Sequence, residues 1–241
     1  MATETNALGQ PVGWRVNGWT PPPYPPLEPM LGRTCRLEPL DVTAHAAHLH
    51  AANLWDTDGA NWTYLPYGPF ETLEGYIAWM TGAVAGTDPQ FHAVVDLASG
   101  KAVGLASYLR IDPAAGSIEV GHINYSPLLQ RTVSAPEAMY LMMKRAFDLG
   151  YRRYEWKCNA LNAPSRAAAL RLGFSYEGVF RQARVDKGRN RDTAWYAMVD
   201  KEWPALDAVF RRWLDPSNFD QRGRQQMSLS TLTAPIVVSR G

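Results

Sequence analysis

The segment SPLLQRTVSAPEA, residues 126–138, joins an alternating, strand-like stretch to a stretch of helical composition. Ser134 and Glu137 have the spacing of a capping box, and Pro136 occupies the first helical turn, where its missing N–H is tolerated. We therefore expect a strand, a loop and a capped helix that ends at Gly150. Free backbone N–H groups and the positive end of the helix dipole would make this loop a place for an anion to bind.

The flanking sequence continues the alternation of strands and helices on both sides of this segment. Hydrophobic spacing and turn residues predict strands at residues 33–40, 91–96, 102–111, 117–125, 151–158, 174–183 and 193–200. They predict helices at residues 42–54, 72–84, 134–149, 162–172 and 202–214. The order indicates one mixed α/β domain over residues 31–214.

Two further motifs follow the loop. Asn162 and Ser165 begin the next helix, and Leu172-Gly173-Phe174 follows at its end. With the loop, they resemble the GNAT superfamily of acyl-CoA-dependent N-acyltransferases, and most of all its RimJ/RimL-like branch, over about residues 33–203. In that family the loop follows Q/R-x-x-G-x-G/A and cradles the coenzyme pyrophosphate. Here Gln130 and Ala135 fit the pattern, but Val133 replaces its first glycine.

The resemblance implies a GNAT-type fold, in which a mostly antiparallel central sheet has two splayed parallel strands in the middle and helices on its sides. The splayed strands would be residues 117–125 and 151–158, with acetyl-CoA as cosubstrate between them and no metal. The implied coenzyme-binding residues are Ile123, Asn124, Gln130, Arg131, Thr132, Val133, Ser134, Ala135, Asn162 and Ser165. A backbone N–H near Ile123 or Asn124 would polarise the thioester carbonyl.

The expected chemistry requires an acceptor amine without its proton, because an amine with a pKa of about 10.4 is mostly charged at neutral pH. Glu119 is the candidate base, and the competing interpretation is a strand carboxylate that faces solvent or pairs with an arginine. His122 is the second candidate, on the opposite pleat face unless a bulge intervenes, and the competing interpretation is a polar core residue with its hydrogen bonds satisfied. Ser165 either hydrogen-bonds the leaving thiolate or only completes a helix start. Tyr176 is a second candidate donor, or a packing residue.

The acceptor side of the site is expected at the aromatic loop of residues 61–70. Its candidate substrate-binding residues are Trp62, Tyr64, Tyr67 and Phe70, unless they cap the core. The basic turn at 187–191 either reaches an anionic group or is a solvated hairpin tip. The leading hypothesis is an acetyl-CoA-dependent N-acetyltransferase that acts on the primary amine of a small molecule or a protein N-terminus. The alternative, prompted by Val133, is a coenzyme A-binding regulatory module with little or no transfer.

Composition limits the other classes of function. The chain has 24 Lys and Arg against 23 Asp and Glu, a formal charge of +1, which gives little support to nucleic-acid binding. No apolar run reaches the roughly 18 residues of a membrane helix, and the N-terminus has no secretory pattern, so we expect a cytoplasmic protein without a membrane partner. Cys35 and Cys158 are expected to be isolated buried thiols, and His45 and His48 lack the further ligands of a metal site.

The two ends of the chain differ from the domain. Six of the 18 prolines lie within residues 21–29, which predicts an extended strap over 20–29 in an N-terminal segment of residues 1–30. This strap would lie on the domain, cover the acceptor cleft or brace a homodimer. Residues 215–241 are polar and are expected to form a loosely held tail.

Overall fold

The computed structural model describes residues 3–241. Within this range eight strands form one mixed sheet, in the order β3-β4-β5-β6-β7-β8-β10-β9. The strands are β3 (Met30–Leu31), β4 (Cys35–Pro39), β5 (Gln90–Asp96), β6 (Ala102–Asp112), β7 (Ser117–Tyr125), β8 (Arg153–Asn159), β9 (Ser175–Asp186) and β10 (Arg189–Val199). Neighbouring strands are antiparallel except β7 and β8, which run parallel at the centre. The expected fold class is confirmed.

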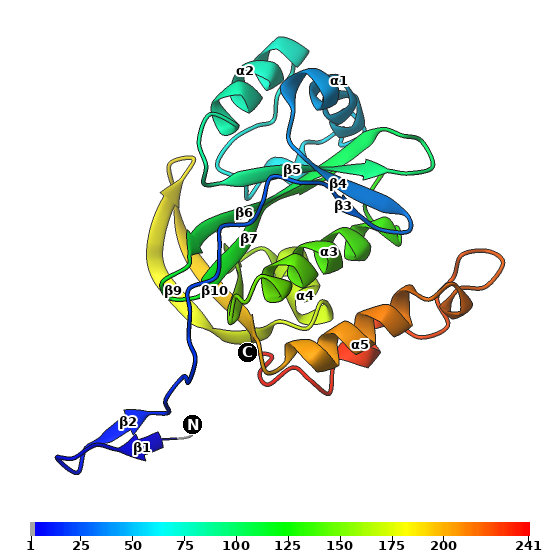
Figure 1. Ribbon diagram of the computed structural model, residues 1–241. Helices are drawn as coiled ribbons and strands as arrows, with labels where there is room; N and C mark the ends of the chain where they lie inside the picture. Colours follow the sequence, from blue (N-terminus) through cyan, green and yellow to red (C-terminus); the bar gives the residue numbers. More distant parts are fainter. Residues whose placement is uncertain (1–2) are drawn as a thin grey trace.

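Helices cover both faces of the sheet (Figure 1). They are α1 (Val42–Asn53), α2 (Leu73–Ala83), α3 (Ser134–Asp148), α4 (Ala163–Arg171), α5 (Trp203–Leu214) and α6 (Leu229–Thr233). Because side chains alternate along a strand, β5 contributes Val94 to the core beneath α3 and Val95 to a second core beneath α1 and α2. Across residues 3–241, no helix has both the length and the apolar character that a bilayer crossing requires.

The start of α3 differs from the expected capping box. Val133 is the N-cap and makes no side-chain cap bond, and the Ser134 hydroxyl donates to Thr34 Oγ1 at 3.0 Å. The buried Glu137 carboxylate accepts the backbone N–H groups of Arg33 and Thr34 at 2.7 Å and of Cys35 at 3.1 Å. The expectation was wrong because the chain entering β4 brings three N–H groups to Glu137, and a charged acceptor satisfies them better than its own helix end does.

We predict that Glu137→Gln destabilises the protein by about 2 kcal/mol, because the neutral amide accepts fewer bonds and turns its NH₂ toward backbone donors. Urea unfolding at neutral pH measures the change. Glu74→Gln, an exposed carboxylate in the first turn of α2, is the matched control and should unfold like wild type. Equal midpoints for both variants would contradict the assignment.

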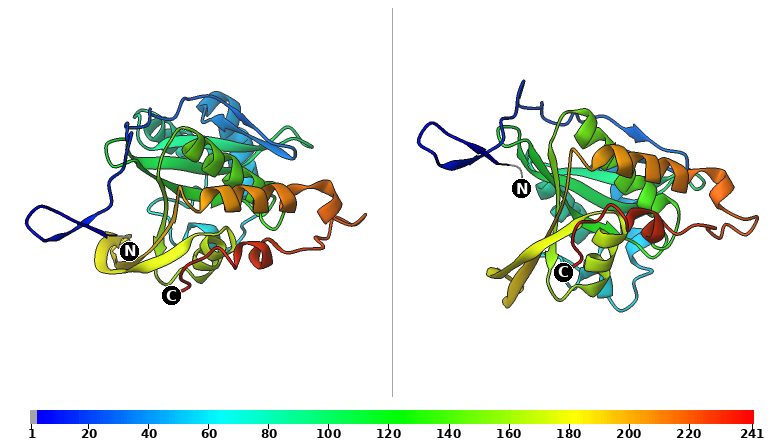
Figure 2. Two further views of the ribbon diagram at one scale, coloured as in Figure 1. Left: turned by 60° about the horizontal axis from the view of Figure 1, so that its bottom comes forward. Right: turned by 90° about the horizontal axis from the view of Figure 1, so that it is seen from below.

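The proline-rich strap lies on the domain as expected. Because proline has no N–H, residues 20–29 are held through their carbonyl oxygens. Tyr151 donates to Pro23 O at 3.1 Å, the Gln90 amide donates to Pro25 O at 3.2 Å, and Arg145 donates to Glu28 O at 2.6 Å. Figure 2 shows the strap running along the domain from a separate, projecting hairpin.

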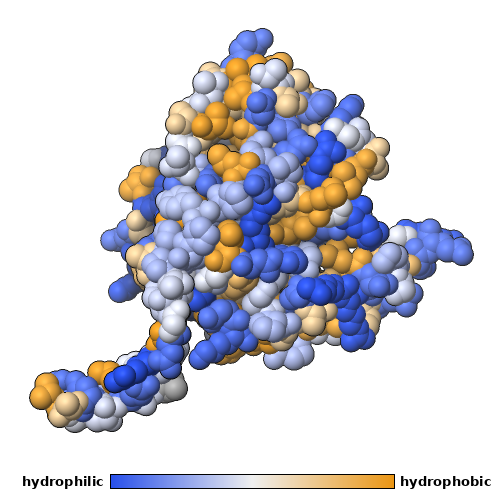
Figure 3. Space-filling model, viewed as in Figure 1, coloured by the Kyte–Doolittle hydropathy of each residue, from blue (hydrophilic) through white to orange (hydrophobic). Residues whose placement is uncertain are grey.

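That hairpin pairs β1 (Thr3–Thr5) with β2 (Pro11–Gly13). All six strand residues are exposed, and Leu8, between the two strands, is also largely exposed. Apolar surface is visible on the hairpin in Figure 3.

The C-terminal tail is packed on the domain, so the expectation of a loosely held segment was wrong. Leu229 in α6 is buried, and Ile236 packs against the main core. Val238 donates its N–H to Ser175 Oγ at 2.9 Å, and Ser239 O accepts the N–H of Tyr176 at 2.9 Å. A few widely spaced apolar residues, among them Leu229 and Ile236, anchor this otherwise polar segment to the core. The domain limit at residue 214 stays a prediction.

His92 gives the fold a pH dependence. Its side chain is fully buried beside Gln90 O, and burial, followed by the charge of Arg145, lowers its pKa to about 4. Between that value and the ordinary one near 6.5, the unfolded chain binds more protons than the folded one. Stability from this group is therefore complete above about pH 6.5 and is lost as the pH falls toward 4.

We predict that His92→Gln flattens the fall of stability between about pH 6.5 and 4, by about 3 kcal/mol at most. Urea midpoints measured across this range compare the two proteins. His48→Gln, which removes an exposed histidine of α1, should keep the wild-type slope. Parallel curves for wild type and His92→Gln would show that His92 does not carry the effect.

Candidate active site

The central strands β7 and β8 separate partway along their length. Their ladder runs from Ser117↔Arg153 to Val120↔Trp156, and no later pair joins them within residues 3–241. On its other side β7 pairs with β6, where Ser107 is opposite Gly121 and Leu105 is opposite Asn124. β7 therefore has one extra residue in this interval, and a β-bulge lies at His122, which has a φ of 50°. The sheet is therefore split beyond Val120.

Two cavities meet at this split. A cavity of about 560 Å³ lies on the side of α3 and α4, and one of about 410 Å³ lies against the aromatic loop and the β9–β10 hairpin. Both are lined by Tyr64, Ile123, Trp156, Asn162 and Ser165. We call them the helix-side cavity and the hairpin-side cavity. Groups bound in the two cavities would approach each other at the split.

The helix-side cavity contains most of the expected coenzyme-binding residues. The backbone N–H groups of Arg131, Val133, Ser134 and Ala135 have no acceptor in the described chain, and they lie at the start of α3. Val133 has a φ of −66°, which any residue adopts, so the replacement of glycine causes no backbone strain here. Its side chain packs against the main core.

Asn124 is a polar residue whose partners are missing. It is 2 % exposed, lines the helix-side cavity, and neither its Oδ1 nor its Nδ2 has a partner among residues 3–241. Buried amides are nearly always hydrogen-bonded, so this site fits a ligand with amide groups of its own. Gln130 instead donates to Asn61 Oδ1 and Tyr125 O, both at 2.8 Å, and secures the loop.

Asn162 and Ser165 stand where the two cavities meet. Asn162 caps α4 by accepting the Ser165 N–H at 3.1 Å, as expected from the sequence. The Trp156 indole donates to Ser165 Oγ at 3.1 Å. Since that oxygen already accepts a bond, the hydroxyl proton of Ser165 is directed elsewhere and can be donated.

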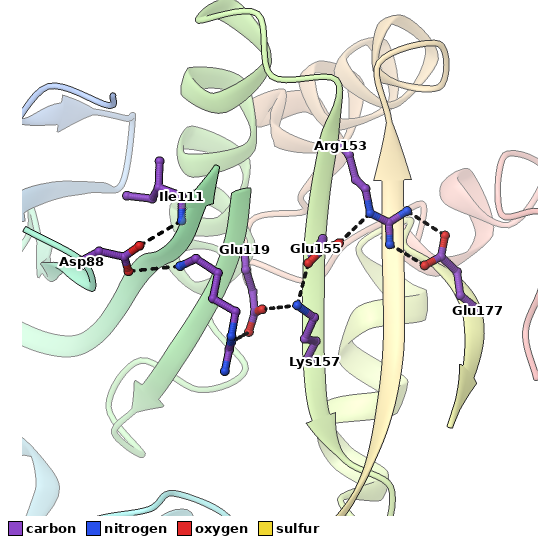
Figure 4. Close-up of polar contacts among 8 residues, drawn as sticks. Asp88, Ile111, Glu119, Arg153, Glu155, Lys157 and Glu177 are labelled. Carbon is purple, nitrogen blue, oxygen red and sulfur yellow. Dashed lines mark hydrogen bonds and ion pairs between the residues drawn. The ribbon is translucent and has the colours of Figure 1, made fainter. Parts of the chain in front are cut away.

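Glu119 lies in the hairpin-side cavity between two cations. It is 3 % exposed; Arg110 donates to its Oε1 at 2.7 Å, and Lys157 Nζ lies 2.7 Å from its Oε2. Lys157 also contacts Glu155 at 2.7 Å, and Arg153 links Glu155 to Glu177. Figure 4 shows this row of alternating charges crossing the strands. Glu119 therefore pairs with an arginine, as the competing interpretation expected.

A second β-bulge directs Arg110 toward Glu119. Leu109 is opposite Glu119 and Asp112 is opposite Ser117, so β6 has one extra residue in this interval. Arg110 lies there and has a φ of 47°. The Asp88 carboxylate accepts the N–H groups of Arg110 and Ile111 at 3.0 and 2.9 Å, which satisfies the backbone that the bulge leaves unpaired (Figure 4).

His122 lines the same cavity as Glu119. We expected His122 on the face opposite Glu119 if β7 had no bulge. The bulge at His122 turns its side chain toward the cavity that Glu119 lines. Its Nδ1 lies 3.1 Å from the Tyr67 hydroxyl, and the two rings stack at 5.6 Å. Burial, followed by the charges of nearby arginines, lowers the pKa of His122 to about 4. The imidazole is therefore neutral at pH 7.

The aromatic loop divides between site and core. Tyr64 lines both cavities and donates to Leu161 O at 3.2 Å, and Tyr67 reaches the site through His122. Trp62 and Phe70 were also expected to bind substrate, but they pack edge to face at 5.5 Å in the core beneath α1 and α2. Two apolar rings are better buried there than exposed to a wet cleft.

Two other expectations are corrected by position. Tyr176 lines neither cavity within residues 3–241; its ring packs against Tyr196 at 5.5 Å and against Gly241. The basic turn is exposed at residues 187–190, as a solvated tip would be, but the Lys187 ammonium is engaged, because its Nζ donates to Trp62 O at 2.8 Å and Gly68 O at 3.0 Å. It ties the hairpin to the aromatic loop.

Sequence reasoning missed several residues of the hairpin-side cavity. They are Arg110, Lys157, Thr193 and Trp195, whereas Arg191 belongs to the basic turn that was expected to reach an anionic group or to be solvated. The signal available was a charged or polar residue at alternate positions of otherwise buried strands, as in 153–159 and 191–195. Among residues 3–241, no three His, Cys, Asp or Glu side chains are grouped to hold a metal ion, and Cys35 and Cys158 are free and buried.

Comparison with known proteins gives a consistent picture. A family model described as an acetyltransferase (GNAT) domain matches residues 35–175. A GCN5-related N-acetyltransferase from Brucella melitensis is 46 % identical, with a TM-score of 0.89, over 91 % of this chain and 100 % of that one. A probable GNAT-family acetyltransferase from Chromobacterium violaceum is 43 % identical, with a TM-score of 0.76, over 81 % and 98 %.

A more distant structure shares the fold alone. It is the microcin C7 self-immunity acetyltransferase MccE in complex with acetyl-CoA and AMP, 20 % identical, with a TM-score of 0.61, over 70 % of this chain and 93 % of that one. No curated protein matches. Since the family model spans more than half of the chain and the Brucella structure spans nearly all of it, this protein belongs to the GNAT family and is an acyltransferase.

Proposed function

We propose that the protein is an acetyl-CoA-dependent N-acetyltransferase that transfers the acetyl group directly to the primary amine of a small molecule. The observation that carries the proposal is the meeting of two cavities at the split between β7 and β8. One cavity would hold the coenzyme and the other the acceptor, so that no covalent intermediate on the protein is needed. The acetyl-CoA bound by MccE, which shares the fold, supports this donor.

The helix-side cavity is the proposed site of the coenzyme. The free N–H groups at residues 131–135 and the Arg131 guanidinium would bind its pyrophosphate, and the unpaired Asn124 amide would bind its pantetheine amides. When bound, the coenzyme supplies the acetyl group as an activated thioester. The unstrained backbone of Val133, with its side chain packed on the core, supports the enzyme over a binding module without transfer.

The Lys187 bridge beside the hairpin-side cavity favours a small acceptor over a protein N-terminus. The aromatic loop and the β9–β10 hairpin border a cavity of about 410 Å³, and the Lys187 side chain of the hairpin is bonded to the loop backbone. A peptide would have to pass this tie. Placement in the RimJ/RimL-like branch, a cytoplasmic location and a homodimer stay predictions.

Residues at the split would assist the transfer in three ways. A backbone N–H near Ile123 or Asn124, beyond the end of the β7–β8 ladder, would stabilise the developing oxyanion. Ser165 would donate its free hydroxyl proton toward the leaving sulfur. Glu119, or else His122, would accept the proton of the amine. Glu119 must release an oxygen from Arg110 or Lys157 to do so.

The coenzyme cavity and the transfer can be tested separately. Calorimetry should show acetyl-CoA binding to the wild-type protein, and adding primary amines should then release free thiol. Binding without thiol release across a broad amine panel would replace the proposal by a coenzyme-binding module.

We predict that Asn124→Leu weakens acetyl-CoA binding about tenfold, because the ligand's amides lose their buried partner. Its urea midpoint without ligand should equal or exceed that of wild type, because two unpaired polar atoms are removed. Calorimetry and urea unfolding measure the two effects. A lower midpoint with unchanged affinity would place Asn124 in the fold and not in the coenzyme site.

We predict that Glu119→Gln lowers kcat about 100-fold at neutral pH and leaves acetyl-CoA affinity within about twofold, as expected for loss of a base. Glu155→Gln is the matched control, because Glu155 contacts the same Lys157 but is not among the residues lining either cavity of the described chain. It should keep most of the turnover. If both variants lose activity equally, or if the pH–rate profile of Glu119→Gln is unchanged, Glu119 is not the base.

A further inference from the structure

Three polar atoms on β10 are buried against the hairpin-side cavity without partners in residues 3–241. They are Arg191 Nε, Thr193 Oγ1 and Trp195 Nε1, and all three residues line the cavity. We propose that these donors bind an oxyanion group, a carboxylate or a phosphate, on the acceptor. The substrate is then a small amine that also carries an acid group. This inference rests on the proposed function and names its substrate class.

The three side chains lie on one face of a regular strand. The ladder of β10 with β8 includes Thr193↔Asn159 and Trp195↔Lys157 and shows no irregularity. The irregularity near Arg191 belongs to β9. Arg191 is opposite Arg184 and Thr193 is opposite Phe180, so β9 has two extra residues there while β10 stays regular. Positions 191, 193 and 195 therefore point the same way, at the spacing of a pleated strand.

The chemistry of the three groups selects an acceptor of hydrogen bonds. The Arg191 and Trp195 nitrogens only donate, and the Thr193 hydroxyl donates readily. Thr193 is 5 % exposed, and a hydroxyl so deeply buried is normally paired. An oxyanion offers several lone pairs to several donors at once and bears the charge that Arg191 prefers.

The fixed position of Trp195 supports a binding role. Its ring lies 4.5 Å from that of Phe180, and Lys157 Nζ stands 3.8 Å from the ring centroid. Ring packing and the cation–π contact hold the indole in place. Its N–H is thereby oriented before the substrate arrives.

The charges around the cavity also favour an acid group. The lining cations are Arg110, Lys157, Arg184 and Arg191; Glu119 is the one carboxylate among the lining residues of the described chain, and His122 is neutral. Asp186 pairs with Arg184 and Arg191 from behind, and Glu155 pairs with Lys157. The lining itself thus holds four cations and one carboxylate, and Asp88, Asp186 and Glu155 stand outside the lining. A simple ammonium would meet this excess positive charge, whereas an acid group on the same molecule offsets it.

Matched acceptor pairs test the proposal. Phenylalanine is compared with phenethylamine for the carboxylate, and phosphoethanolamine with ethanolamine for the phosphate, by thiol release at saturating acetyl-CoA. At least one acid-bearing member should have a kcat/KM about tenfold or more above its neutral partner, and the preferred pair identifies the acid group.

Variants connect this preference to β10. Thr193→Val keeps the shape and removes one donor, and Trp195→Phe removes the indole N–H while leaving a smaller aromatic ring beside Phe180. Each should raise KM for the acid-bearing acceptor about tenfold. KM for the neutral partner and acetyl-CoA affinity should not change. Arg181→Met, which removes an exposed cation of β9 outside this cavity, is the charge control and should behave like wild type.

Direct binding separates this inference from the proposed function. Calorimetry measures the same acids against protein saturated with coenzyme A. Transfer that favours the neutral amines, or acid binding unaffected by Thr193→Val, overturns the inference and leaves the acetyltransferase proposal in place. Acid binding that Thr193→Val abolishes, without transfer to any amine, supports the oxyanion site and overturns the proposed function. If the protein shows no transfer and no acid binding, both the inference and the proposed function are overturned.

Discussion

The end of hydrogen bonding between β7 and β8 is the constraint on which the site depends. After Val120↔Trp156 the two strands diverge, and the backbone of β7 beyond this point needs other partners. Asn61 and Gln130 supply two of them by donating to Tyr125 O at 3.4 and 2.8 Å. The same contacts bring the aromatic loop and the loop before α3 to the split. The opening in the sheet and the two walls beside it thus have one cause.

The two β-bulges explain how ionisable groups come to face this opening. A regular β6–β7 ladder would alternate its side chains strictly, but extra residues at Arg110 and His122 turn both inward. Burying charges here costs solvation, which pairing and hydrogen bonding must offset. Arg110 and Lys157 bind the two oxygens of Glu119, and Asp88 binds the backbone of the bulge. Such a costly arrangement is more easily explained by chemistry at this site than by stability.

Local sequence signals predicted the elements but not the contacts between them. The Asn162 cap follows from neighbouring residues, and the pairing of the two central strands follows from the family resemblance; both are found as expected. Glu137 has an equally clear local signal, yet it binds the chain at residues 33–35, which only the folded sheet brings near. The bulge at His122 and the tie at Lys187 likewise depend on partners far along the chain. Periodicity and capping patterns carry no information on such partners.

The excess positive charge of the hairpin-side cavity bears on reactivity as well as on recognition. Glu119 is already paired with two cations, Arg110 and Lys157, and His122, with a pKa of about 4, is a weak base. A strong base is less necessary where nearby cations lower the pKa of the bound ammonium and favour its neutral, nucleophilic form. A plain amine, however, would bind such a cavity poorly. An acid group held at β10 would supply the missing attraction at a distance from the nitrogen, so that the substrate could bind tightly while its amine is still kept uncharged.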